Sequence, residues 1–180
     1  MHNRARPHHH PARRLLSNRR KFDAVLDQEW KRAQRDGHWL TLVLLDVDFF
    51  KRYNDRYGHA CGDDCLRAVA AQCVRPADLV ARYGGEEFAL VLPEVDPAGA
   101  QMLLRSVLVA VDHTQIEHAD SACAPHVTIS LGAVSIKPGR LDELQKVMRR
   151  VDELLYQAKE RGRHRAEHED TSVMQLTEVA

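Results

Sequence analysis

The sequence has no excess of charge of either sign. Lysine and arginine together number 26, and so do aspartate and glutamate, which gives a formal net charge of zero. Proteins that bind the phosphate backbone of DNA or RNA over a wide face usually carry a basic excess, so we expect no nucleic-acid partner. A small phosphorylated molecule held by a few local cations fits this balance better.

Cysteines are few and scattered, and long apolar runs are missing. The cysteines at 61, 65, 73 and 123 include no CxxC pair with a second ligand cluster, which argues against a zinc site and favours a reduced, cytoplasmic setting. No apolar run reaches the roughly 18 residues of a membrane span, and residues 1–14 lack the apolar core of a signal peptide. We therefore expect no membrane segment on this chain.

The length and composition indicate one domain with flexible ends. A chain of 180 residues, 44% of them hydrophobic, is long enough for one real core and short for two ordinary domains. Residues 1–15 hold prolines, histidines and arginines without periodicity, and we interpret them as a disordered or linker lead-in. The domain is expected over residues 16–166, followed by a flexible tail over residues 167–180.

Apolar spacing and turn residues predict an alternation of helices and strands. Apolar residues three and four apart indicate helices, continuous apolar runs indicate buried strands, and Asp96-Pro97 is typical of a helix start. The expected elements are helices over 17–36, 49–57, 63–74, 97–111 and 141–161, and strands over 40–47, 79–83, 86–92 and 127–134. Their order predicts an α/β fold with a mixed central β-sheet flanked by helices, of ferredoxin-like type.

Two consecutive acids stand at the tip of a predicted β-hairpin. The pair Gly84-Gly85 separates two strand-like runs, which favours a tight primed turn with positive φ at both glycines. Glu86 and Glu87 follow and begin the returning strand. Because successive side chains on a strand face opposite ways, the two glutamates are expected to have different roles. The alternative interpretation is a solvated hairpin tip.

A second source of carboxylates is the apolar run over residues 40–47, which ends in Asp46-Val47-Asp48. If this strand lies beside the hairpin, Asp46 and the glutamates together offer ligands for Mg²⁺, which takes one or two carboxylates plus substrate phosphates. Nucleotidyl transfer from a triphosphate needs such ions, a base near the attacking hydroxyl, and cations that absorb charge on the leaving pyrophosphate. The pattern therefore points to metal and phosphate chemistry.

Several segments in fixed order carry a wider set of motifs. They are LDVDFFK at 45–51, ND at 54–55, GHACGD at 58–63, RYGGEEF at 82–88, and DELLYQAK at 152–159 with Gly162-Arg163 after it. This set resembles the GGDEF-domain diguanylate cyclases, and the resemblance covers about residues 16–165. It implies a fold like the polymerase palm and the adenylyl cyclase core, and an enzyme that joins two GTP molecules into cyclic di-GMP and releases two pyrophosphates.

The resemblance also implies roles around the acids. Asp46, the backbone carbonyl of Val47 and Glu87 would hold Mg²⁺ or Mn²⁺ ions. Glu86 would face the 3′-hydroxyl as a base or as a second-metal ligand. Lys51 would stabilise phosphate charge in the transition state, although it also fits an ordinary surface lysine.

Asn54 and Asp63 match the family's guanine readers, and His59 is expected near the nucleotide. A carboxylate accepts well from the guanine N1 and N2 edge, so these residues would select GTP over ATP. Asn54 also fits a turn residue, Asp63 a helix cap, and His59 a satisfied loop histidine.

Lys159 and Arg163 match positions that hold the β- and γ-phosphates. They stand four apart near the end of the last predicted helix, where they are expected to share a face. Cations there also complement the helix dipole, which is the alternative interpretation. At the hairpin, Gly84 and Gly85 leave little side-chain bulk, so the backbone can approach a triphosphate closely.

Arg75 and Asp78 have the spacing of the family's RxxD site for the inhibitory product. Arginine can bind phosphate or guanine through two hydrogen bonds, and aspartate can accept from a guanine edge. Arg105 is a possible second arginine of that site. The alternative is a plain ion pair in a loop.

The chain departs from the family at its start and leaves other functions open. Where the family has DxLTGLxNRR, residues 11–20 read PARRLLSNRR, which affects the expected orientation of the N-terminus and the link to an upstream regulatory domain missing from this chain. Two sites must face each other to close the cyclic product, so a homodimer is expected. The alternatives are a non-catalytic module that senses cyclic di-GMP or GTP, and a mononucleotide cyclase or other palm-like transferase.

Overall fold

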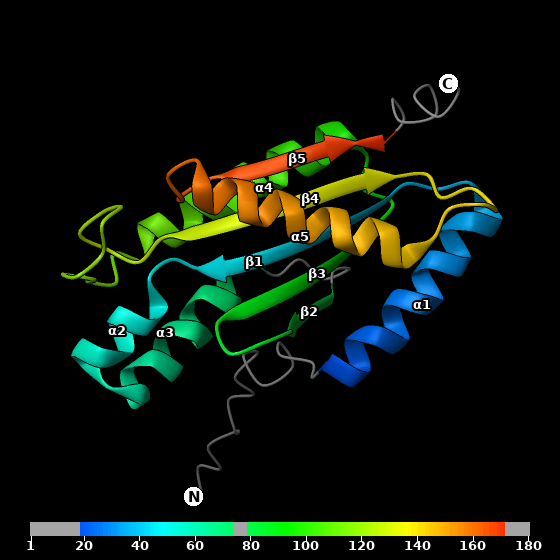
Figure 1. Ribbon diagram of the computed structural model, residues 1–180. Coiled ribbons are helices and arrows are strands. Elements are labelled where there is room, and N and C mark those ends of the chain that lie inside the picture. Colours follow the sequence, from blue (N-terminus) through cyan, green and yellow to red (C-terminus); the bar gives the residue numbers. More distant parts are fainter. Residues whose placement is uncertain (1–18, 74–78, 172–180) are drawn as a thin grey trace, which may run out of the picture.

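A five-stranded β-sheet forms the centre of the computed structural model, which describes residues 19–73 and 79–171 (Figure 1). The strands are β1 (Leu40–Val47), β2 (Leu79–Arg82), β3 (Glu87–Pro93), β4 (Ile129–Ile136) and β5 (Ala166–Asp170). The helices are α1 (Arg19–Asp36), α2 (Phe50–Tyr57), α3 (His59–Gln72), α4 (Pro97–His113) and α5 (Leu144–Glu160). Within these residues, no helix has the length and apolar character that crossing a membrane requires.

The sheet has the strand order β2-β3-β1-β4-β5, with β1 in the middle. β1 runs antiparallel to both β3 and β4, and β5 runs parallel to β4. The sheet is therefore mixed. Its first four strands, with the helical connections between β1 and β2 and between β3 and β4, have the ferredoxin-like arrangement, which confirms the predicted fold class.

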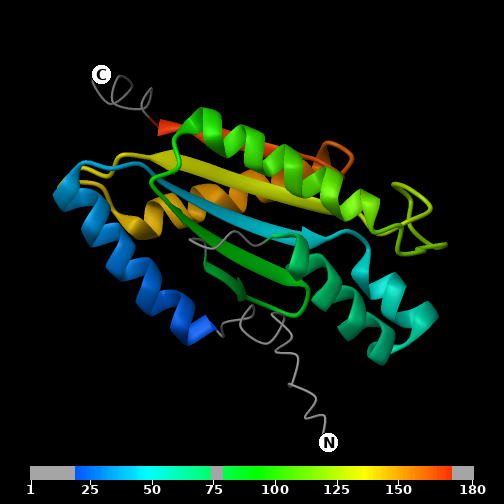
Figure 2. The same cartoon turned by 180° about the vertical axis from the view of Figure 1, so that it is seen from behind.

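Helices cover both faces of the sheet, and this explains why β1 is apolar at nearly every position. Leu42 and Leu44 pack with α1 and α5 on one face, whereas Val43 and Leu45 pack with α3 and α4 on the other. Figure 2 shows the second face, with α3 and α4 in front of the strands. Because alternate side chains point to opposite faces, Asp46 belongs to the face covered by α1 and α5.

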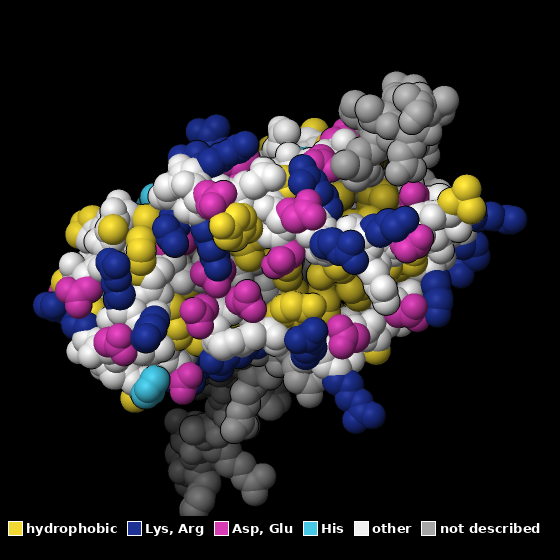
Figure 3. Space-filling model, in the orientation of Figure 1, with side chains coloured by type: hydrophobic (Ala, Val, Ile, Leu, Met, Phe, Trp, Pro, Cys, Tyr) yellow, Lys and Arg dark blue, Asp and Glu magenta, His cyan; other side chains and the backbone are white. Residues whose placement is uncertain are grey.

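The face that carries α1 and α5 has a mixed surface. In Figure 3, lysine and arginine side chains are interspersed with aspartate and glutamate, with no single large basic patch in view. This distribution agrees with the balanced composition and differs from the extended positive face of many nucleic-acid-binding proteins.

Strand β5 corrects the sequence analysis, which placed a flexible tail from residue 167. Residues 166–170 instead pair in parallel with β4, from Leu131↔Ala166 to Ser135↔Asp170. Side chains also hold the strand, since Arg150 Nη2 lies 2.6 Å from Glu169 Oε2 and His168 Nε2 lies 2.8 Å from Ser135 Oγ. The sequence AEHED lacks the apolar alternation of a strand because this edge position is only half-buried.

The third helix also starts earlier than predicted. α3 begins at His59 with Gly58 as its N-cap, at φ 84°, so Gly62 lies inside the helix rather than in a loop. Asp63 stands in the second turn, and the interpretation of Asp63 as a helix cap is therefore wrong. Asp96 is a true cap of α4, because its Oδ1 accepts a hydrogen bond from the N–H of Gly99 at 2.8 Å.

Candidate active site

The ends of β1 and β3 bring the predicted carboxylates together. Asp46 and Glu87 are direct partners in the antiparallel ladder, where Cα atoms of paired residues lie about 4.5–5.5 Å apart. Paired residues also face the same side of the sheet, here the side covered by α5. Glu86 adjoins them, because its carbonyl oxygen accepts from the N–H of Val47 at 3.4 Å. The first strand thus lies beside the hairpin, which is the condition on which the predicted ligand set depended.

Asp46 is a buried carboxylate in an electrostatically crowded place. It is 7% exposed, and Lys159 Nζ lies 2.9 Å from its Oδ2. Burial raises the pKa of Asp46 to about 6, with Lys159 opposing the rise and the charges of Glu86 and Glu87 adding to it. The three acids thus act on one another, and one ammonium group partly balances them.

The hairpin turn differs from the predicted primed type, because neither Gly84 nor Gly85 has a positive φ. Instead, the carbonyl oxygen of Glu87 accepts from the N–H of Tyr83 at 2.8 Å and from the N–H of Gly84 at 3.2 Å. A β-carbon on Gly84 would lie 2.5 Å from Glu87 Oε2, whereas one on Gly85 would meet nothing within 4 Å. A side chain at Gly84 would therefore push the Glu87 carboxylate from its place, whereas the φ of Gly84 does not call for glycine.

The donor set fits a hard divalent cation that is shared with a substrate. Among the residues that the structure describes, no group of three or more His, Cys, Asp or Glu side chains is arranged to hold a metal ion alone. Asp46 and Glu87 nevertheless offer two carboxylates at neighbouring positions, and Val47 is the last residue of β1 beside them. Two carboxylates completed by phosphate oxygens and water are a usual environment for Mg²⁺.

Asn54 and Gly62 form a second part of the site, between α2 and α3. The Oδ1 atom of Asn54 is buried and has no hydrogen-bond partner among the described residues. It lies against Gly62 so closely that any β-carbon there would overlap it. A buried amide oxygen without a partner suits a ligand that donates a hydrogen bond.

Asp63 lies next to the hairpin, as the prediction of one shared site requires. Arg82 links the two, since its Nη1 lies 3.8 Å from Asp63 Oδ1 and its Nη2 donates to the carbonyl oxygen of Gly85 at 2.7 Å. Lys51 on α2 and His59 at the start of α3 are exposed. No ion pair joins either side chain to an acid within the described part of the chain.

The C-terminal end of α5 supplies the predicted cations, but not from one helix face. α5 ends at Glu160, and Arg163 follows Gly162 with φ 62°, so Lys159 and Arg163 are not neighbours on a helix as predicted. Lys159 points to Asp46, whereas the guanidinium of Arg163 lies 4.5 Å from the ring centroid of Phe49. The two cations thus lie on separate parts of the site.

Asp48 was named in the sequence only as one of the carboxylates at the strand end, and the structure gives it a different place. It is 1% exposed, and its carboxylate accepts from Ser130 Oγ at 2.7 Å, Thr128 Oγ1 at 2.8 Å and the N–H of His164 at 3.1 Å. The sequence signal was a charged residue directly after a nearly continuous apolar run, but only the fold reveals its inward direction.

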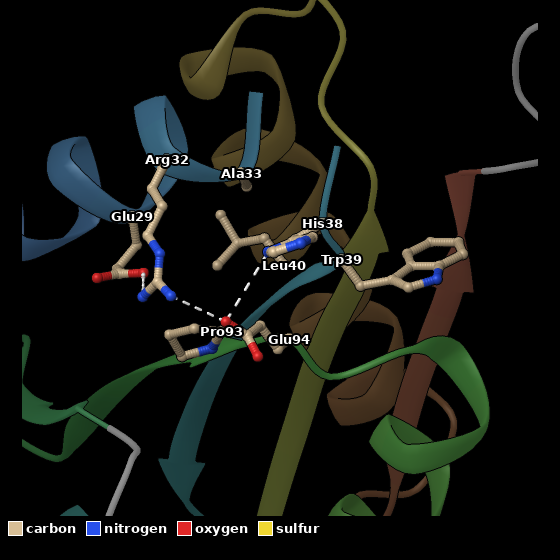
Figure 4. Close-up of a pocket in the computed structure, with 8 residues that line it drawn as sticks. All are labelled: Glu29, Arg32, Ala33, His38, Trp39, Leu40, Pro93 and Glu94. Atoms are coloured by element: carbon tan, nitrogen blue, oxygen red, sulfur yellow. Dashed lines mark hydrogen bonds and ion pairs between the residues drawn. The ribbon is translucent and has the colours of Figure 1, made fainter. Parts of the chain in front are cut away.

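The predicted inhibitory pair, Arg75 and Asp78, lies outside the described residues. Arg105 is exposed on α4. A small surface hollow lies at the opposite end of β1 from Asp46, beside Leu40 (Figure 4). Its volume is about 10 Å³, room for about one water molecule, and the ion pair of Arg32 with Glu94 at 3.0 Å lies across it. It has none of the predicted site residues.

Comparison with known sequences identifies the family of the chain. Residues 15–165 match the family described as diguanylate cyclase, GGDEF domain. The response regulator PleD of Caulobacter vibrioides (strain NA1000 / CB15N) is 40% identical over 152 residues, which cover 83% of this chain and 33% of PleD. Diguanylate cyclase DgcP of Pseudomonas aeruginosa is 36% identical over 162 residues, covering 84% of this chain and 22% of DgcP. The chain thus spans about a third or less of these relatives.

Solved structures give the same result. The coiled coil and GGDEF domain of DgcB from Caulobacter crescentus, in complex with c-di-GMP, matches with a TM-score of 0.76 at 32% identity, over 86% of this chain and 82% of that chain. The active GGEEF domain of a diguanylate cyclase from Vibrio cholerae matches with a TM-score of 0.73 at 30% identity, over 85% of this chain and 97% of that chain. The protein therefore belongs to the family of diguanylate cyclase GGDEF domains.

Proposed function

We propose that the protein is a divalent-cation-dependent diguanylate cyclase that condenses two GTP molecules into cyclic di-GMP. The observation that carries the proposal is the pairing of Asp46 with Glu87 across β1 and β3, with Lys159 Nζ at 2.9 Å from Asp46. Two carboxylates and one ammonium at the end of a sheet suit a triphosphate with its cation. The relatives named diguanylate cyclases support the same activity.

In this proposal Asp46, the carbonyl of Val47 and Glu87 would hold Mg²⁺ or Mn²⁺. The bound ion would supply charge neutralisation on the phosphates. Glu86 would accept the proton of the attacking 3′-hydroxyl or bind a second ion. Each attack forms a bond from the 3′-oxygen to an α-phosphorus and breaks the bond to pyrophosphate, so two attacks close the ring.

Cations would bind the leaving pyrophosphate. Lys159, in the last turn of α5 beside Asp46, and Arg163, after the helix and over Phe49, would hold the β- and γ-phosphates. Lys51 would add charge from α2. Positive groups already fixed in place stabilise the transition state without reorganisation during the reaction.

The guanine end is proposed to lie between α2 and α3. Asn54 has a buried amide oxygen without a partner, and Asp63 lies near the hairpin through Arg82. His59 stands at the exposed start of α3. A base with N–H donors at N1 and N2 would satisfy these acceptors, which adenine cannot do at the same edge.

Two further parts of the proposal concern assembly and regulation. One subunit holds one GTP, so two subunits must face each other and the active form is a homodimer. Arg75 and Asp78, with Arg105, would bind the product and inhibit. The four free cysteines suit the reducing cytoplasm.

The direct test is incubation with GTP and Mg²⁺ over a range of protein concentrations, with products identified by mass spectrometry. The proposal expects cyclic di-GMP, at a rate that rises faster than linearly with protein. A well-folded protein that binds cyclic di-GMP or GTP with no turnover at any concentration would instead be a sensor. An intramolecular cyclic nucleotide as product would overturn the proposal too.

A further inference from the structure

The buried carboxylate of Asp48 has only neutral donors around it. Within the described residues no lysine, arginine or histidine side chain forms an ion pair with it, and it is 1% exposed. A buried carboxylate without a cation depends on its hydrogen bonds, so losing one leaves charge that is poorly compensated. This makes the geometry of its donors strict.

The donors of Asp48 come from segments that are far apart in the sequence. Thr128 and Ser130, at the start of β4, donate through their hydroxyl groups, and His164 donates its backbone N–H at 3.1 Å. The backbone N–H of Asp48 also donates to the carbonyl of Thr128 at 3.0 Å. One side chain therefore ties the end of β1 to β4 and to the segment after α5.

That last segment has a backbone that needs such support. Gly162, Arg163 and His164 have φ values of 108°, 62° and 52°, and a run of positive φ is unfavourable for the two residues with side chains. Besides the bond to Asp48, the N–H of Arg163 donates to the carbonyl of Ala158 at 2.9 Å. The bond at His164 fixes the residue directly after Arg163.

The Arg163 side chain packs on a residue that adjoins Asp48 in the sequence. Its guanidinium lies 4.5 Å from the ring centroid of Phe49, the residue next to Asp48. Phe49 also has a positive φ, 56°, and its carbonyl oxygen lies 3.3 Å from His118 Nε2. Through its bond to the His164 N–H, Asp48 therefore fixes the backbone that carries the arginine side of this contact.

We propose that Asp48 is a positioning residue that presets the Arg163 guanidinium for the triphosphate tail of the nucleotide. This inference rests on the proposed function, in which Arg163 binds the β- and γ-phosphates. A cation that is already ordered loses less conformational entropy on binding than a free one. Asp48 acts through Arg163 and not on the reacting atoms.

The binding test uses two nucleotides that cannot condense: 3′-deoxy-GTP, which lacks the attacking hydroxyl, and GMP, which lacks the leaving group. Asp48→Asn keeps the shape but places an N–H₂ group among donors. We expect it to weaken 3′-deoxy-GTP about tenfold, as lost charged hydrogen bonds do, and to leave GMP within about twofold. Equal losses for both nucleotides would overturn the proposal.

A double-mutant cycle separates positioning from general damage. In an Arg163→Ala background, Asp48→Asn should cost no further affinity for 3′-deoxy-GTP, because the group it positions is gone. Losses that simply add would contradict the role. Ser130→Ala is the matched control, since its hydroxyl donates to Oδ1 while His164 donates to Oδ2, and it should keep affinity within about threefold.

A nucleotide-free measurement keeps this inference separate from the proposed function. In NMR spectra, the side-chain Nε–H of Arg163 should be shifted by the ring of Phe49 in the wild type and lose that shift in Asp48→Asn. Arg52, whose guanidinium lies 4.9 Å from the same ring but comes from α2, should keep its shift. If the protein binds no GTP, the proposed function fails, yet these signals still decide the role of Asp48.

The wild type alone also tests the connection if Asp48→Asn does not fold. The amide of His164, bonded to a buried carboxylate, should exchange with deuterium far more slowly than the amides of exposed residues. Fast exchange at His164 would overturn the proposal.

Discussion

Lys159 reaches from the last turn of α5 to the carboxylate of Asp46 at the end of β1, with Nζ at 2.9 Å from Oδ2. Asp46 carries a raised pKa despite this cation, because burial outweighs the ion pair. The site thus keeps a carboxylate in a place that disfavours its charge, which is a cost in stability that a bound cation would relieve.

Replacing Asp46 by asparagine should therefore stabilise the protein at neutral pH while removing activity. With a pKa of about 6, against an ordinary 3.8, the folded state binds this proton more tightly than the unfolded state. The stabilisation by the protonated carboxyl group is fully present below pH 3.8 and is lost as the pH rises through about 6. At pH 7.5, Asp46→Asn should therefore raise the free energy of unfolding by up to about 3 kcal/mol. Urea unfolding in metal-free buffer measures the free energy of unfolding of both proteins. A variant less stable than the wild type would contradict the prediction.

The matched glycines of the hairpin give a second prediction. Gly84→Ala should lower the rate of cyclic di-GMP formation at least about tenfold, because the methyl group displaces the Glu87 carboxylate by steric contact. Gly85→Ala meets no atom within 4 Å and should keep nearly full activity. Both variants should unfold at similar urea concentrations. Equal activities in the two variants would show that Glu87 is not the reason for Gly84.

Base selectivity should depend on the contact of Asn54 with Gly62. Gly62→Ala pushes a methyl group into the Asn54 amide, and we expect weaker binding of GTP with little change for ATP. Gly139→Ala, in a loop where the new carbon meets only Asp142 at 3.4 Å, is the control. Calorimetry with both nucleotides decides. A parallel loss for GTP and ATP would mean that the contact does not read the base.

His118 predicts a loss of stability in mild acid. Its ring is buried, Nδ1 has no partner among the described residues, and burial lowers the pKa of His118 below its ordinary 6.5. Folding favours the neutral imidazole of His118. The stability that it contributes is fully present above pH 6.5 and is lost as the pH falls through the lower pKa of the folded state. His118→Gln should reduce the change of the urea midpoint between pH 7 and pH 5, and an unchanged pH dependence in this variant would contradict the prediction.

The cysteines should differ sharply in reactivity. Burial raises the pKa values of Cys65 and Cys73 to about 12, whereas Cys61 is exposed and Cys123 is half-buried. Because the thiolate is the reactive form, a thiol reagent at pH 7.5 should modify Cys61 first, then Cys123, and leave the buried pair intact. Peptide mass spectrometry of the native protein gives the order. Modification of Cys65 before unfolding would contradict the described core.

The sequence predicted what depends on apolar periodicity and on local chemistry. The run over residues 40–47 was correctly predicted as a strand buried on both faces, and Asp96 as a helix cap. It did not predict β5, because the residues AEHED owe their strand to pairing with β4 and to ion pairs such as Arg150–Glu169. Those are tertiary interactions that a local pattern does not contain.

In the candidate site, too, some features were predicted from the sequence and others were not. The sequence offered Asp46 and the hairpin glutamates as ligands on the condition that their strands are neighbours, and only the structure gives the register of Asp46 with Glu87. The turn at Gly84-Gly85 was wrong in type, because a glycine pair signals a positive φ in most hairpins but here serves the space of a neighbouring side chain. Asp48 and His118 were missed as buried polar groups, because polar residues are usually exposed and only the fold shows their donors.

The cation at Asp46 and Glu87 is the centre of the account. The most direct measurement is the reaction of wild type and Glu87→Gln with GTP as Mg²⁺ is titrated, with folding followed by circular dichroism. We predict that the wild type makes cyclic di-GMP only with Mg²⁺ or Mn²⁺ and that folded Glu87→Gln makes at least about a hundredfold less. Turnover in a chelator, or an undiminished rate in Glu87→Gln, would contradict it.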